Sequence, residues 1–103
     1  MIKVIVGYKV KEGADIALTL LRLRSYAMTF PGFIGAENLR SEKDGSITAM
    51  ASTWENVENW RTWESAKIRK QILREAENLF AEEPRVTIYR IMPTTAWEYT
   101  RLE

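Results

Sequence analysis

Residues 53–65 read Thr53-Trp54-Glu55-Asn56-Val57-Glu58-Asn59-Trp60-Arg61-Thr62-Trp63-Glu64-Ser65, and they hold three of the four tryptophans of the chain. Trp54 ends a predicted strand, and Asn56 is of a type that caps helices, so a helix is expected to begin there. Trp60 and Trp63 are three positions apart and share one face of that helix. Large aromatic surfaces are costly to leave in water, so this face either fills a core or walls an apolar pocket.

The segments before this stretch predict two strands and a helix ahead of the strand that Trp54 ends. Residues 2–10 alternate, with one apolar face formed by Ile2, Val4, Val6, Tyr8 and Val10, which indicates a half-buried strand. Residues 14–29 predict a helix with an apolar stripe, bordered by Leu21 and Met28, and Pro31-Gly32 ends it. Residues 33–40 and 46–54 predict two strands joined by a short polar loop containing Asp-Gly.

The segments after this stretch predict a second helical piece and a last strand. Ser65 is expected to cap the second helix, whose Ile68, Ile72 and Leu73 face inward. Its basic residues are expected to face solvent: Lys67, Arg69, Lys70 and Arg74. Pro84 ends the helical region, and residues 85–92 form the last predicted strand. Residues 94–103 are a tail that carries Trp97 and Tyr99.

The order of these elements indicates an α+β fold, a ferredoxin-like β-α-β-β-α-β sandwich spanning residues 1–93 as one domain. Its two helical segments cover one face of a four-stranded antiparallel sheet. Lys9, Glu37 or Arg40 is expected on the other face, yet Ile5 and the run Ala49-Met50-Ala51 make the strands apolar on both sides. That pattern is typical of a sheet covered on both faces. A homodimer is therefore predicted, with two sheets forming a dimeric α/β barrel.

The composition excludes several classes of chemistry. The 103 residues include no cysteine and no histidine, so disulfides, Cys/His zinc sites and histidine-dependent nucleophilic dyads are ruled out. We therefore predict no metal and no cofactor, and any acid–base step falls to Lys, Tyr, Asp or Glu. No glycine-rich phosphate-binding motif occurs. No apolar run is long enough to span a membrane, and the N-terminus predicts a strand rather than a signal peptide, so a cytoplasmic location without a membrane partner is expected.

Nucleic-acid binding is not expected either. RNA-recognition domains share this element order and stack bases on aromatic residues of their third strand. The third strand here, Ser46 to Thr53, contains no aromatic residue, and the formal net charge of the chain is only +1.

Short motifs spread over most of the chain resemble the antibiotic biosynthesis monooxygenase family. They are Pro31-Gly32-Phe33 between helix and strand, Trp54-Glu55 leading into a helix, Trp63, and a closing strand from Pro84 to Tyr89. The resemblance implies a small dimeric α/β-barrel protein. The family includes cofactor-free oxygenases that convert phenols or hydroquinones to quinones, haem-degrading oxygenases, and members with no known activity.

The haem-degrading branch fits this sequence poorly. That branch uses an asparagine on the first strand, a tryptophan on the helix and a histidine beyond it. Trp63 matches the tryptophan, but Val6 or a neighbour stands in place of the asparagine. The histidine would fall near Ile72, and the chain has no histidine at all. Haem degradation is therefore not expected.

The cofactor-free branch implies an apolar cavity that holds an aromatic substrate and stabilises its anion for direct reaction with oxygen. The candidate catalytic residues are Tyr8, as a hydrogen-bond donor to a phenolate, and Trp63. The candidate substrate-binding residues are Trp60, Asn38 and Arg24. The predicted function is a cofactor-independent monooxygenase for a small phenol, hydroquinone or polyketide-like aromatic.

A non-catalytic alternative stays open. In it, the protein is a dimeric barrel that binds a small apolar ligand or serves only in assembly, and the tryptophans are ordinary packing. A deep apolar cavity lined by Trp63 and a buried polar donor would favour the enzyme. A solid core would favour the alternative.

Overall fold

Strand β1 (Ile2–Lys9) lies at the centre of the fold because its alternating sequence gives it one fully apolar face. The structure, a computed structural model, describes residues 1–93. The elements that follow β1 are α1 (Ala17–Ala27), β2 (Phe33–Arg40), β3 (Ile47–Trp54), α2 (Val57–Glu64), α3 (Lys67–Ala76), the 3-10 turn η1 (Glu77–Leu79) and β4 (Arg85–Arg90). The β-α-β-β-α-β order predicted from the sequence is confirmed. The tail with Trp97 and Tyr99 lies outside the described residues, so the predicted boundary at 93/94 stays a prediction.

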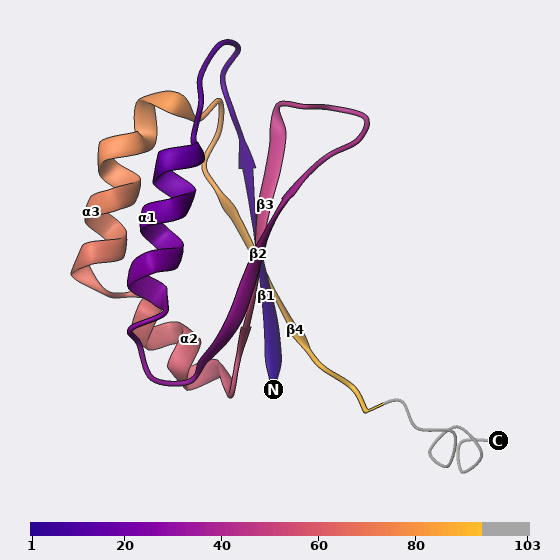
Figure 1. Ribbon diagram of the computed structural model, residues 1–103, viewed down its shortest axis with the longest axis vertical. Coiled ribbons are helices and arrows are strands. Elements are labelled where there is room, and N and C mark those ends of the chain that lie inside the picture. The colour runs from indigo at the N-terminus through magenta and orange to yellow at the C-terminus, as the bar shows by residue number, and fades with distance from the viewer. Residues whose placement is uncertain (94–103) are drawn as a thin grey trace, which may run out of the picture.

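The four strands form one antiparallel sheet in the order β2-β3-β1-β4, which is the ferredoxin-like arrangement. Val4 pairs with Ser52 of β3 on one side and with Ile88 of β4 on the other. Residues that pair directly project to the same face, so this register sorts every strand residue onto one of two faces. The helices all lie on one side of the sheet (Figure 1).

The core lies between that side of the sheet and the helices. The N-cap residue of α1 and three residues of the helix face it, together with the apolar face of β1. They form the stripe that the sequence predicts: Ile16, Leu20, Leu23 and Ala27. The largest fully buried side chains are Trp54, Trp60, Ile72 and Val4. Leu21 and Met28, at the border of the predicted stripe, are exposed instead, because one helix buries only a narrow arc against a sheet.

Two helix boundaries show how local sequence positions this core. Asn56 caps α2 as predicted, and its side-chain oxygen accepts a hydrogen bond from the backbone N–H of Asn59 at 2.9 Å. The prediction that Ser65 caps α3 is wrong, because Ala66 is the capping residue. The Ser65 hydroxyl donates to the carbonyl oxygen of Arg61 and so belongs to the end of α2.

The turn between α1 and β2 depends on glycine at position 32. Gly32 has φ of 81°, and a Cβ there would collide with the Asn59 side chain at the start of α2. Its carbonyl oxygen accepts a hydrogen bond from the N–H of Glu55 at 2.9 Å. The Pro31-Gly32-Phe33 motif therefore lets this turn lie directly against the segment that begins α2.

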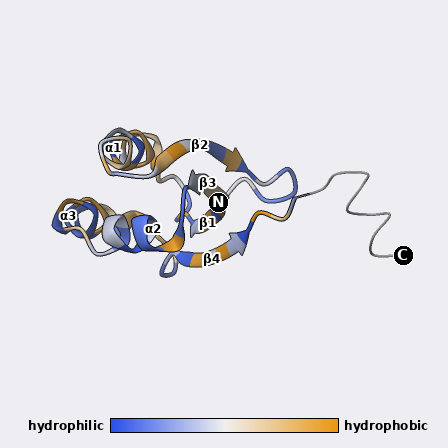
Figure 2. Ribbon diagram, turned by 90° about the horizontal axis from the view of Figure 1, so that it is seen from below, coloured by the Kyte–Doolittle hydropathy of each residue, from blue (hydrophilic) through white to orange (hydrophobic). Residues whose placement is uncertain are grey.

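The second face of the sheet has no layer from within residues 1–93, because the helices lie together on the other side (Figure 2). The strand register places small residues at its centre, including Gly7, Ala49 and Ala51, with Ile5 beside them. Leu39 and Tyr89 lie on the outer strands of this face and are 47% and 53% exposed. Lys9 and Glu37 lie on it as expected.

Arg40 is the exception to the expected placement of charges. It pairs with Thr48, which is buried under the helices, so its side chain is on the helix side and the prediction is wrong. Within residues 1–93, none of the helices has the length and apolar content that a membrane crossing requires.

Candidate active site

Helix α2 directs its two tryptophans toward the sheet, where each packs edge-on against another aromatic ring of the core. Trp63 contacts Phe30 edge-on, with ring centroids 5.0 Å apart. Trp60 meets Trp54 edge-on at 6.0 Å, and Trp54 meets Phe33 in the same way at 5.3 Å. The prediction that Trp60 and Trp63 share a buried face is confirmed, since both are almost fully buried.

Tyr8 lies on the sheet side of this cluster. It is on the apolar face of β1, with its ring stacked on Phe80 at a centroid distance of 5.5 Å. Burial raises the pKa of the Tyr8 phenol to about 12, although the positive charge of Arg69 acts in the opposite direction. Tyr8 is therefore neutral near neutral pH and is suited to donate a hydrogen bond, not to act as a base.

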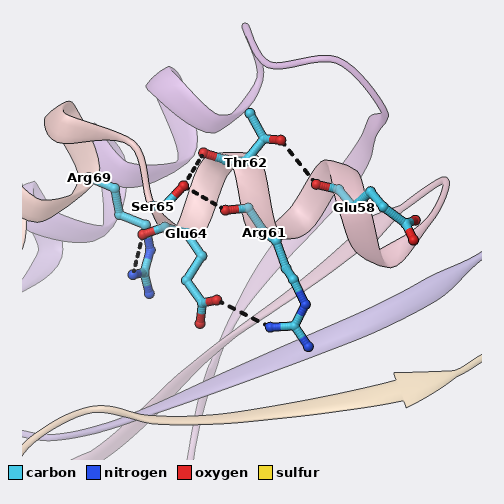
Figure 3. Close-up of polar contacts among 6 residues, drawn as sticks. All are labelled: Glu58, Arg61, Thr62, Glu64, Ser65 and Arg69. Carbon is cyan, nitrogen blue, oxygen red and sulfur yellow. Dashed lines mark hydrogen bonds and ion pairs between the residues drawn. The ribbon is translucent and has the colours of Figure 1, made fainter.

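Arg69 is a site residue that the sequence reasoning missed, and its expected solvent-facing position is wrong. Only 8% of it is exposed, and its guanidinium carbon lies 5.3 Å from the centroid of the Trp60 ring. Figure 3 shows the side chain running back beneath the end of α2, where Nη1 donates to the backbone oxygen of Glu64 at 3.4 Å. The same figure shows Glu64 paired with Arg61 at 3.8 Å instead. Burial lowers the pKa of Arg69, while Tyr8 and Glu64 raise it.

Tyr8, Trp60, Trp63 and Arg69 meet around a small interior void between the sheet and the helices. The void measures about 10 Å³, with Ser52 of β3 also in its lining. A space of this size holds one water molecule at most. The indole Nε1–H of Trp60 is buried without a hydrogen-bond partner. The structure thus gathers three of the five predicted site residues in one place, but the space between them is closed.

Asn38 lies elsewhere, in a cleft of about 670 Å³. The cleft opens between the loop that precedes α1 and the ends of β2 and β3, with Leu20, Arg40 and Thr48 also in its lining. Asn38 pairs with Met50, so its side chain is on the helix side of the sheet. None of the three residues around the interior void lines this cleft, so Asn38 is not part of that group.

Arg24 belongs to neither space. Its Nη1 donates to the sulfur of Met28 at 3.9 Å, one turn further along α1, at the helix surface. It lines neither the interior void nor the cleft.

A third space, a groove of about 610 Å³, runs between α3 and β4. Its apolar wall comprises Leu73, Phe80, Pro84 and Val86. Arg69 lines this groove as well as the interior void, so its side chain stands between the two. Among residues 1–93, no group of three or more Asp, Glu, His or Cys side chains is placed to hold a metal ion.

Comparison with known proteins agrees with this architecture. Residues 1–75 match the family model described as antibiotic biosynthesis monooxygenase. No curated protein sequence matches the chain.

Several solved structures share the fold at low sequence identity. One is a putative antibiotic biosynthesis monooxygenase from Bordetella bronchiseptica, which is 22% identical over 89% of this chain and 97% of that chain, with a TM-score of 0.78. Another is a putative antibiotic biosynthesis monooxygenase from Nitrosomonas europaea, 15% identical over 90% of this chain and 100% of that chain, with a TM-score of 0.77. A third is SnoaB from Streptomyces nogalater, described as a cofactor-independent oxygenase. It is 13% identical over 92% of this chain and 96% of that chain, with a TM-score of 0.78.

Proposed function

Because the chain belongs to the antibiotic biosynthesis monooxygenase family, we propose that it is a cofactor-independent monooxygenase acting on a small phenol, hydroquinone or polyketide-like aromatic. The description of SnoaB as a cofactor-independent oxygenase supports this class of reaction at the level of shared fold. The substrate class rests on the chemistry of the interior group, which consists of Tyr8, Trp60, Trp63 and Arg69.

The observation that carries the proposal is an unsatisfied donor that lies beside a cation in the protein interior. Within residues 1–93, the buried side-chain donor without a partner is the Trp60 Nε1–H, and the Arg69 guanidinium beside it makes one long hydrogen bond, to the backbone oxygen of Glu64. Leaving a neutral donor buried without a partner costs about 1–3 kcal/mol. A structural core gains nothing from that cost, whereas a site that binds an oxyanion does.

The proposed reaction needs only the substrate and dioxygen. A phenol with a free ring carbon opposite its hydroxyl gives the hydroxyl proton to solvent water. The resulting phenolate reacts with oxygen at that carbon, and the peroxide formed takes a proton back from solvent. The peroxide formed there loses water, so that phenol and dioxygen give a quinone and one water molecule. Arg69 and the neutral Tyr8 hydroxyl stabilise the phenolate oxygen, and Trp63 stacks on its ring.

The residues of the proposal are therefore a subset of the predicted ones, with one addition. Tyr8 and Trp63 act on the substrate, Trp60 adds a donor and a stacking surface, and Arg69 adds the positive charge. Asn38 and Arg24 are not included, because one lines a separate cleft and the other lies at the surface of α1.

The void of about 10 Å³ sets a condition on this mechanism. A phenol ring is far larger than a water molecule, so side chains around the void must separate when the substrate enters. Arg69 has a long flexible side chain and faces the groove between α3 and β4, so it is the side chain best placed to move.

The closed interior also favours a second candidate function. A core with room for one water molecule at most is what a non-catalytic barrel protein would have. In that case the family fold serves ligand binding at the surface or assembly alone.

We further propose that the protein is a homodimer whose two sheets face each other. The open face combines small central residues with exposed Leu39 and Tyr89, a composition suited to close sheet packing. Sedimentation velocity at micromolar concentration tests this independently. A monomer would contradict the dimer without affecting the assignment of the interior group.

The proposed activity is tested by oxygen uptake with a panel of anthrones and of phenols that have a free ring carbon opposite the hydroxyl. Uptake is expected to exceed the uncatalysed rate and to fall in Tyr8→Phe and Trp63→Phe. Trp54→Phe is the matched control for Trp63→Phe, since Trp54 is equally buried but does not line the void. Tyr26→Phe is the control for Tyr8→Phe, since Tyr26 is exposed on α1. Uptake no faster than the background would favour the non-catalytic alternative.

A further inference from the structure

The groove between α3 and β4 has a buried cation at its inner end. Arg69 is more than nine-tenths buried, and it lines both this groove and the interior void. The Trp60 ring lies against the guanidinium on one side. The groove is therefore a concave space that ends at a positioned positive charge.

That charge has no counter-charge in direct contact. Within residues 1–93, no carboxylate lies within ion-pairing distance of Arg69, and Glu64, whose charge acts on Arg69, pairs with Arg61. A buried charge without a partner is costly, whereas a guanidinium can bind a carboxylate or phenolate through two parallel hydrogen bonds. An anionic ligand group would supply what this part of the protein lacks.

The rest of the groove indicates what else the ligand carries. Leu73, Phe80, Pro84 and Val86 provide an apolar surface that suits an aromatic ring. Three carboxylates at the exposed rim, those of Glu77, Glu82 and Glu83, repel ligands with several negative charges, while Lys70 and Arg74 lie on the opposite, α3 side. The combination fits a ligand with one negative charge.

We propose that this groove binds an aromatic monoanion, with its carboxylate or phenolate held by Arg69 and its ring against the apolar wall. This inference deepens the proposed function, because it assigns the substrate class and the route by which the ring reaches Trp63. It rests on that function only for turnover, since binding in the groove does not require catalysis.

The proposal is tested by calorimetric titration of the full chain with 2-naphthoate and with 2-naphthamide, its neutral analogue. The protein is expected to bind 2-naphthoate about tenfold more tightly than 2-naphthamide, and Arg69→Met is expected to remove that preference. Lys70→Met and Arg74→Met are matched controls, because each removes a positive charge from the exposed side of the same groove. Both are expected to retain most of the preference.

A second variant covers the case in which Arg69→Met does not fold. Val86→Trp, at an exposed position of β4, fills the groove and is expected to weaken 2-naphthoate binding about tenfold while circular dichroism stays unchanged. Equal affinity for the acid and the amide overturns the proposal. So does an equal loss of preference in Arg69→Met and Arg74→Met, or 2-naphthoate binding that Val86→Trp leaves intact.

The outcomes also separate this inference from the proposed activity. Selective binding of 2-naphthoate without oxygen uptake on any phenol would support the groove and contradict the monooxygenase. Oxygen uptake by a protein that does not distinguish 2-naphthoate from 2-naphthamide would do the reverse.

Discussion

Trp54 and Trp60 are in edge-to-face contact at 6.0 Å and are about equally buried. Only one of their two indole N–H groups has a hydrogen-bond partner. The Nε1–H of Trp54 donates to the Ser52 hydroxyl at 3.0 Å. The Nε1–H of Trp60 has no partner, and its ring lies against the buried Arg69. The buried N–H at the Trp54 end of the aromatic cluster is thus hydrogen-bonded, and the buried N–H at the Trp60 end is not.

This difference indicates which part of the cluster stabilises the fold. At the Trp54 end, every feature contributes to stability: a full hydrogen bond, packing against Phe33, and the strand–helix corner. At the Trp60 end, Tyr8 and Arg69 are buried in ways that cost stability, one with a raised pKa and one without a carboxylate partner. Proteins tend to tolerate such costs at functional sites.

The largest expected effect on stability is at the Trp54 end of the cluster. Trp54→Ala removes the side chain that joins Phe33, Trp60 and Ser52, so it should lower the free energy of unfolding by about 3–5 kcal/mol. Urea denaturation followed by circular dichroism measures this. A loss below about 1 kcal/mol would mean that the core collapses around the gap and that Trp54 is not central to packing.

The next effect concerns Tyr8 at the other end. Its pKa is about 12 in the folded protein against an ordinary 10.0, so the folded state resists loss of the phenol proton. The stability that depends on a neutral Tyr8 is complete below pH 10 and is lost as the pH rises toward 12. The loss amounts to about 2–3 kcal/mol.

Stability curves of the parent protein and Tyr8→Phe between pH 9 and about 12 test this linkage. The difference between the two curves isolates Tyr8, because the other titrating groups are common to both proteins. The variant should lose less stability over this range. Parallel curves would show that Tyr8 is not buried as a neutral phenol.

A smaller effect compares the two tryptophans directly. Trp54→Phe leaves the buried Ser52 hydroxyl without its donor, whereas Trp60→Phe removes an N–H that has no partner. Trp60→Phe should therefore cost about 1–2 kcal/mol less than Trp54→Phe, although both lose the same volume. Thermal denaturation of the two variants side by side measures the difference. Equal costs would indicate that Trp60 Nε1 has a partner in solution, such as a bound water.

The fold could be predicted from the sequence because its patterns are local. The alternation in β1 and the stripe of α1 each identify a buried face without knowledge of the rest of the chain. The Asn56 cap and the Pro31-Gly32 turn are likewise decided by neighbouring residues. The sequence predicts the wrong helix for Ser65, because a serine between two helices can hydrogen-bond to either one and only the tertiary packing selects between them.

The site could be predicted only in part, because it depends on contacts between distant segments. Tyr8, Trp60 and Trp63 converge as the helix and strand patterns imply. Arginine is seldom buried, so residue type alone predicts a solvent-facing Arg69. Arg69 is three residues before Ile72 and seven before Ala76, which places it on the buried arc of α3. The helical spacing therefore predicts burial, whereas the charge of the side chain predicts exposure. The positions of Asn38 and Arg24 could not be predicted in this way, because they depend on which space each residue of the strand or helix faces.

The smallest expected effect on stability is that of Arg69→Met. It tests directly whether the Trp60 end of the cluster differs from the Trp54 end. The substitution loses a weak hydrogen bond and a cation–π contact, but it also ends the burial of an unpaired charge, and methionine fills a similar length. These terms oppose each other, so the free energy of unfolding should change by no more than about 1 kcal/mol. Urea denaturation gives the value. A loss above about 3 kcal/mol would mean that Arg69 is paired in the folded protein and serves the core, as Trp54 does.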